Sequence, residues 1–192
     1  VAPGSLVNVE IEFVARLPRV FERTGYKGDF YLVGQWFPKV GVLQESGWNC
    51  HQFHNHSEFF SDFGLYDVQI TVPSDYVVGA TGAQTAPPAA HADGTSTWRF
   101  AQDDVHDFAW TADPSYIRQV RWFRYEEQRD PVEEDRVARA MGLPAGSEQI
   151  KLSDVEVTLL IHPEHRSQIE RHFAAAFHAL RYFGYWYGRY PY

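Results

Sequence analysis

The chain has 192 residues, 44% of them hydrophobic and 22% charged, which is typical of a folded globular protein and excludes a disordered chain. Its formal net charge of −8 argues against a general nucleic-acid binder. No apolar run approaches the ~20 residues that a membrane-spanning helix needs. A single cysteine, Cys50, excludes an internal disulfide framework. Because the chain starts at Val1 without a signal-like stretch, we expect it to be part of a longer protein.

Composition and charge both change near residue 112. Residues 1–112 hold 6 basic and 13 acidic side chains and are rich in β-branched and aromatic residues. Residues 113–192 hold 11 basic and 12 acidic side chains and contain the only long helical patterns. We therefore expect a β-rich α+β protein with an antiparallel sandwich-like first part, and a boundary between 112 and 113.

Short alternating segments predict the strands of the first part. Apolar and polar residues alternate over 7–13 and 66–72, and the second of these ends at the turn residues Pro73-Ser74-Asp75. The Ala/Pro/Gly-rich stretch 83–94 indicates a loop. Further strands are expected at 76–80, 95–101 and 107–112.

The second part contains two helix signals and two strand signals. Asp130-Pro131 is typical of a helix start, and this helix is expected to run to Met141 and stop at Gly142. A longer helix is expected from about Pro163 to Gly188, because apolar residues recur there at spacings of 3 and 4. Strands are expected at 120–124 and 155–161.

The charged stretch 118–139 carries six arginines and six acidic residues, which predicts a solvated, ion-paired surface. The aromatic residues of 182–192 would suit a sugar platform, but the helical spacing favours packing or an interface.

One histidine cluster has the residue types of a metal site. His51, His54 and His56 lie close together in sequence with Glu58, and histidine nitrogens are common zinc ligands. The spacing matches no established zinc pattern, so we interpret the stretch as a polar loop and keep the three histidines as an alternative metal site.

Other candidate chemistry is weaker. His162-Pro163-Glu164-His165 lacks the spacing of a zinc-protease helix, which needs histidines at i and i+4 with Glu directly after the first. Cys50 beside His51 is interpreted as a partly buried, inert thiol. The group Asp103, Asp104 and Asp107 is interpreted as a charged turn between strands.

An ordered series of short motifs carries a family resemblance. In chain order these are Gly34-Gln35-Trp36-Phe37-Pro38-Lys39, Gly47-Trp48, Glu58-Phe59, Asp62-Phe63-Gly64, Tyr66-Asp67-Val68, Ile70-Thr71-Val72-Pro73, Tyr76-Val77-Val78-Gly79-Ala80-Thr81-Gly82, Asp104-Val105, Asp107-Phe108-Ala109-Trp110 and Tyr187-Gly188-Arg189-Tyr190-Pro191-Tyr192. The series resembles the membrane alanyl aminopeptidase family of zinc metallopeptidases, the gluzincins. The likeness is weaker in 1–25 and 113–160.

The resemblance implies a specific place within such an enzyme. Residues 1–112 would be the later part of its saddle-shaped β-domain, and 113–192 would be the first strands and long helix of a thermolysin-like domain. The family's Gly-x-Met-Glu-Asn loop and His-Glu-x-x-His zinc helix follow a Tyr-Pro-Tyr like 190–192 and are absent from these 192 residues. No zinc or catalytic residue is therefore expected in this chain.

The resemblance also implies one substrate contact. The family anchors a substrate's free amine partly with a Gln or Glu upstream of the proline that Pro38 resembles, and Gln35 is the nearest polar candidate. The family's Gln-x-Glu-like signature is not recognisable here, which leaves aminopeptidase specificity open.

The expected function is that of a non-catalytic fragment of a zinc-dependent aminopeptidase, with zinc, peptide substrate and the remainder of the catalytic domain belonging to the parent. Two alternatives remain: a zinc-less scaffold relative, and a β-sandwich module that binds peptide or sugar. The presence of a His-Glu-x-x-His motif in the parent would separate the aminopeptidase fragment from the zinc-less scaffold.

Overall fold

The computed structural model describes all residues except 1, 3, 20–22, 52–53, 55 and 57–58. The chain divides into two compact units, Val1–Pro114 and Ser115–Tyr192, here called unit 1 and unit 2. The division lies two residues beyond the change in composition. Both units contain antiparallel sheets, and the helices belong to unit 2, so the β-rich α+β class is confirmed.

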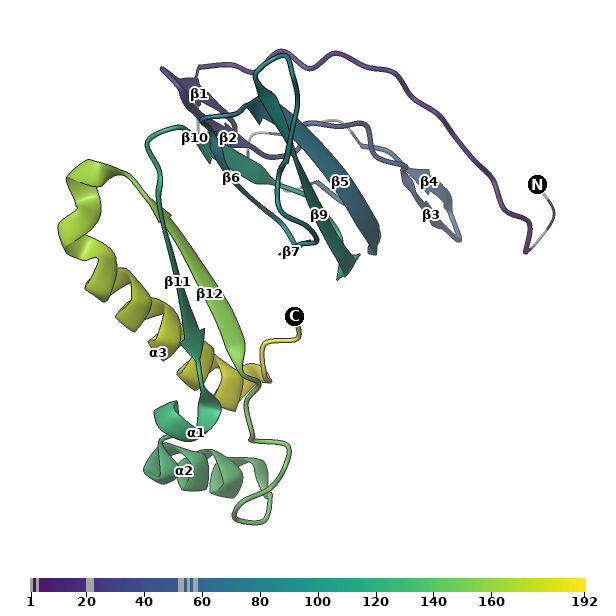
Figure 1. The fold of residues 1–192 in the computed structure, drawn as a ribbon. Helices are drawn as coiled ribbons and strands as arrows, with labels where there is room; N and C mark the ends of the chain where they lie inside the picture. The colour runs from purple at the N-terminus through teal and green to yellow at the C-terminus, as the bar shows by residue number, and fades with distance from the viewer. Residues whose placement is uncertain (1, 3, 20–22, 52–53, 55, 57–58) are drawn as a thin grey trace. The chain divides into compact units, whose positions relative to one another are not determined.

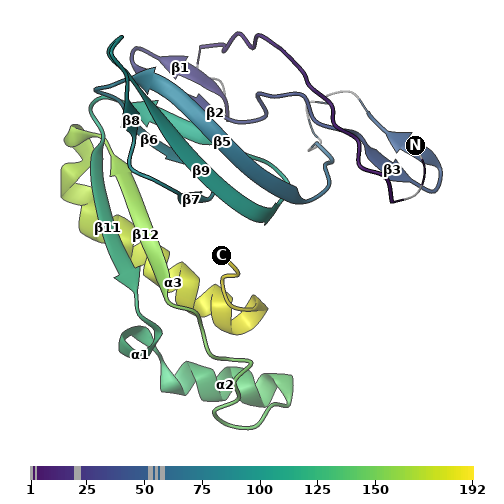
Figure 2. The same cartoon turned by 45° about the vertical axis from the view of Figure 1, so that its right-hand side comes forward.

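Unit 1 is built from antiparallel strands (Figures 1 and 2). One sheet has the order β1-β2-β10-β6, with β1 Gly25–Lys27, β2 Phe30–Val33, β10 Trp110–Asp113 and β6 Val77–Ala80. A second sheet pairs the long strands β5, Gly64–Pro73, and β9, Thr95–Val105, and two short strands, β7 Ala83–Gln84 and β8 Ala89–Ala90, also pair with β9. Strands β3, Val42–Gln44, and β4, Gly47–Asn49, form a separate hairpin.

The core of unit 1 lies where these strands bring apolar side chains together. Phe108 is fully buried, and it packs with Ile70, Val78, Phe100 and Ala112. Ile70 comes from the alternating segment 66–72, where the period of two places it on the buried face of the strand, and Val78 comes from the predicted strand 76–80.

The strand predictions for unit 1 have mixed outcomes. Those at 66–72 and 76–80 are confirmed as β5 and β6, and 95–101 extends to Val105 as β9. The expected loop at 83–94 is partly wrong, because it contains the short strands β7 and β8. The last strand begins at Trp110 rather than at 107.

The strand predicted at 7–13 is wrong. These residues form no strand, and the side chains of Val7, Val9 and Ile11 are 55% or more exposed. A strand is stabilised by hydrogen bonds to a neighbouring strand, and the described residues offer this segment no such partner. Alternation alone therefore did not produce a strand.

Unit 2 consists of a two-stranded sheet and helices. Strand β11, Ile117–Phe123, pairs antiparallel with β12, Val155–Ile161. Between them in sequence lie the short helix α1, Tyr125–Gln128, and α2, Pro131–Met141. A 3₁₀ helix η1, Pro163–Gln168, leads into α3, Ile169–Tyr187, which runs along the strand pair in both views (Figures 1 and 2).

The helix predictions for unit 2 are largely confirmed. Asp130 caps α2 by accepting a hydrogen bond from the Glu133 backbone N–H, and Gly142 ends it in the left-handed conformation at φ 68°. Helix α3 ends before Gly188 as predicted, but residues 163–168 form a 3₁₀ turn rather than its first turns. No residue of that turn is buried, so no packed face selects the α-helical pitch there.

Candidate functional site

Residues that carry the family resemblance meet in the core of unit 1. The Trp36 indole Nε1 donates a 3.1 Å hydrogen bond to the backbone oxygen of Phe108, 72 positions later. The Phe37 ring contacts Trp36 at 5.2 Å and Tyr66 at 5.8 Å between ring centroids. Tyr66 in turn stacks on Phe108 at 6.1 Å. These motif residues therefore hold distant segments together, which is a structural role.

The ammonium group of Lys39 is held in the same region. Its Nζ lies 2.6 Å from Oδ1 of Asp107 and 3.7 Å from the centroid of the Phe59 ring. Both members of the ion pair are largely buried, with side chains 17% and 18% exposed. Removal of the Asp107 carboxylate would leave the Lys39 ammonium charge poorly solvated. The ion pair therefore joins residues 37–39 to residues 107–108, and the ammonium group is already neutralised by Asp107 rather than available to a ligand.

The expected Asp103, Asp104 and Asp107 turn is wrong in part. Asp103 and Asp104 lie inside β9, where Asp104 has a φ of 53°, and only Asp107 lies outside it. Cys50 is exposed rather than partly buried.

Gln35, the candidate for contact with a substrate amine, lies in a bend two residues after the end of β2. Its side chain is exposed, between the buried Val33 and the half-buried Trp36. Its backbone is in the left-handed region, with φ 53°, a conformation that costs a residue with a Cβ atom about 1–2 kcal/mol. Backbone strain of this kind is often found at functional positions. The contact between Gln35 and a substrate amine stays a prediction.

The alternative metal site at His51, His54 and His56 falls in a partly described stretch. The rings of His51 and His54 stack with their centroids 6.0 Å apart. Glu58 lies outside the described residues. Among the residues that are described, no three His, Cys, Asp or Glu side chains come together as metal ligands would.

A buried carboxylate organises the polar interior of unit 2. Oε1 of Glu134, on α2, accepts 2.9 Å hydrogen bonds from the phenols of Tyr125 and Tyr185, and Oε2 lies 2.6 Å from Nη2 of Arg129. Glu134 is 8% exposed, which corrects the expected solvated surface at this position. The charge of the carboxylate is matched, and its oxygens are hydrogen-bonded, as a buried carboxylate requires.

This environment shifts the pKa values of its members. Burial acts to raise the pKa of Glu134, but the hydrogen bonds from Arg129, Tyr125 and Tyr185 outweigh it and hold that pKa below its usual value. Burial and the adjacent Glu134 carboxylate raise the pKa of Tyr125 to about 12. The pKa of Tyr185 is raised for the same reasons. At neutral pH the tyrosines are therefore neutral donors and Glu134 is the ionised acceptor.

The last turns of α3 repeat this pairing of aromatic donors with acidic acceptors. The Trp186 indole Nε1 donates a 2.8 Å hydrogen bond to Glu133, and the Tyr182 phenol donates a 3.3 Å hydrogen bond to Asp130. Tyr185 also accepts a 3.0 Å hydrogen bond from the Asp130 backbone N–H. Tyr182, Tyr185 and Trp186 therefore dock α3 on the start of α2. The other aromatic residues of this stretch, Phe183, Tyr187, Tyr190 and Tyr192, are exposed.

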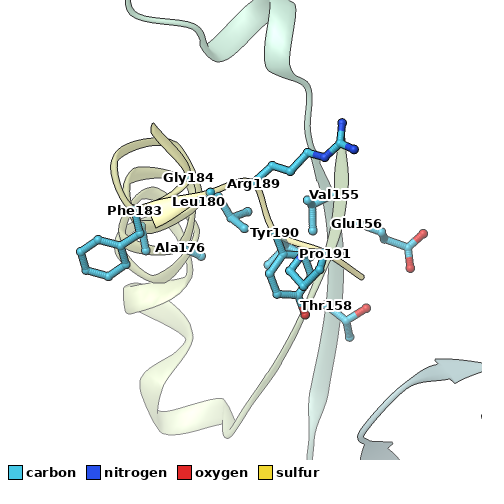
Figure 3. Close-up of a pocket in the computed structure, with 13 residues that line it drawn as sticks. Val155, Glu156, Thr158, Ala176, Leu180, Phe183, Gly184, Arg189, Tyr190 and Pro191 are labelled. Carbon is cyan, nitrogen blue, oxygen red and sulfur yellow. The ribbon is translucent and has the colours of Figure 1, made fainter. Parts of the chain in front are cut away.

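An apolar groove of about 550 Å³ lies between β12, α3 and the residues after α3 (Figure 3). Within the described residues, β12 pairs only with β11, so its other edge is open. Phe183, on the α3 wall of the groove, is 65% exposed. The groove is lined by residues 155–158 of β12, Ala176, Ala179, Leu180, Phe183 and Gly184 of α3, and residues 188–191. Open strand edges beside apolar surface are places where another strand adds to a sheet.

Comparisons with known proteins identify no relative of this chain. No protein-family model, no curated protein and no solved structure matches it. In the part of the chain that the structure describes, no helix is both long and apolar enough to cross a membrane. The aminopeptidase resemblance therefore depends on the ordered motifs alone.

Proposed function

We propose that this chain is a non-catalytic segment of a zinc-dependent, aminopeptidase-like metallopeptidase. In the parent protein it walls the peptide-binding cleft and braces the catalytic domain. Unit 1 is then the later part of the β-domain, and unit 2 is the start of a thermolysin-like domain. The antiparallel sheets of unit 1 and the strand pair followed by a long helix in unit 2 are compatible with this reading.

The observation that most supports the proposal is the meeting of the motif residues. Trp36, Phe37, Tyr66 and Phe108 come from three separate motifs of the resemblance, and they pack in one cluster. This packing is compatible with a preserved scaffold in which each motif supplies part of a single core.

The described residues do not fit a catalytic zinc ion. Such a site needs about three protein ligands with an open fourth position, and no group of three candidate ligands is present among them. In the parent, the residues that hold zinc would lie outside the present 192, and the metal would supply Lewis-acid chemistry for peptide hydrolysis there. This chain would supply shape and support.

The apolar groove of unit 2 fits the same proposal. Isolated apolar surface beside an open strand edge is unfavourable in water and is normally covered. We infer that the remainder of the catalytic domain covers the groove in the parent. It would pair with the open edge of β12 and bury Phe183 and Leu180.

The coding sequence and the full-length protein provide the test. We expect the parent to contain His-Glu-x-x-His followed by a further glutamate, and to release N-terminal residues from peptides until a chelator is added. A parent that lacks the zinc motif and has no peptidase activity would instead be the zinc-less scaffold. Chelator-sensitive peptidase activity of the 192-residue chain alone would overturn the proposal.

Gln35 allows a second test in the full-length protein. We expect Gln35→Ala to raise KM for peptides with a free amine and to leave binding of N-acetylated peptides unchanged. Gln44→Ala is the matched control, because Gln44 is also an exposed glutamine of unit 1 but lies on hairpin strand β3. Equal effects of the two variants would remove Gln35 from the amine site.

A further inference from the structure

We draw no further inference here: the strongest candidate, the apolar groove between the open edge of β12, helix α3 and residues 188–191, belongs to the surface already assigned to the rest of the catalytic domain, and nothing in the structure shows what else covers it.

Discussion

The Tyr185 phenol, near the end of α3, donates a 2.9 Å hydrogen bond to the buried Glu134 carboxylate of α2. The two residues are 51 positions apart. The bond ties the long helix to the segment between β11 and β12, and the Tyr125 phenol bonds the same carboxylate oxygen from α1. Three helices of unit 2 are therefore fixed by one acidic side chain.

Tyr185→Phe is expected to destabilise unit 2 by about 1–3 kcal/mol, because it leaves the Asp130 backbone N–H without its phenol partner and removes one of the two phenol hydrogen bonds to Oε1 of Glu134. Urea unfolding followed by circular dichroism measures this loss. Tyr190→Phe is the control, since Tyr190 is 45% exposed. Equal stability of the two variants would contradict the role assigned to the Glu134 network.

Acid should weaken the same network. The folded-state pKa of Glu134 lies below its ordinary value of 4.5, so its contribution is fully present above pH 4.5 and is lost as the pH falls through the folded-state pKa. We expect the stability difference between the native chain and Glu134→Gln to shrink once the pH falls below 4.5 and to go on shrinking as it falls through the folded-state pKa. Unfolding by urea at each pH measures it, and a constant difference would contradict the prediction.

Substitutions at Gly82 and Gly94 distinguish two ways in which an added Cβ atom can destabilise unit 1, a left-handed backbone conformation and a steric clash. Both have a left-handed φ, of 87° and 84°, but a Cβ at Gly82 would lie 2.6 Å from the Ala101 backbone oxygen, whereas Gly94 faces open space. Gly94→Ala should cost about 1–2 kcal/mol for the conformation alone. Gly82→Ala should cost about 1–3 kcal/mol more, because backbone must move. Urea unfolding followed by tryptophan fluorescence compares them, and equal losses would show that the close approach is absent.

Backbone strain at Gln35 predicts an unusual order of stability. Glycine adopts φ 53° without steric cost, whereas alanine has a Cβ atom and therefore pays the same steric cost as Gln35. Gln35→Gly should therefore be more stable than Gln35→Ala by about 1 kcal/mol. Thermal unfolding of the two variants measures the difference. An alanine variant as stable as the glycine variant would show that the backbone at this position is unstrained.

The exposed groove of unit 2 predicts self-association of the 192-residue chain. Light scattering at several concentrations should show a mass that rises with concentration, and Phe183→Glu should reduce the rise by placing a charge on the apolar wall. Val132→Glu is the control, because Val132 is 79% exposed on α2 and does not line the groove. A strictly monomeric native chain, or equal effects of both variants, would contradict the prediction.

Local signals were sufficient for α2. Asp130 supplies the N-cap, Pro131 has the fixed φ of a first helical residue, and Gly142 supplies the left-handed end. Each of these acts within a few residues of the helix end, so the sequence predicted both bounds correctly. The strand at 7–13 failed for the opposite reason, because its hydrogen bonds depend on a partner that local sequence does not specify.

The resemblance predicted Gln35 as a candidate contact for a substrate amine. No local pattern in the sequence predicted the Glu134 network. Glu134 sits in a charged stretch, and its burial depends on tyrosines that come from α1, before α2 in sequence, and from α3, after it. An arginine, two phenols and a carboxylate become a network only when their helices pack together.

By itself, the sequence determined the β-rich class, the capped helix α2, the long apolar stripe of α3 and the motif order on which the aminopeptidase resemblance depends, because composition, period and cap chemistry act locally. Only the tertiary structure decided that Glu134 is buried, that the aromatic end of α3 docks on α2, and that the edge of β12 borders an apolar groove. Burial and strand pairing depend on contacts between residues far apart in the chain, and no local pattern specifies them.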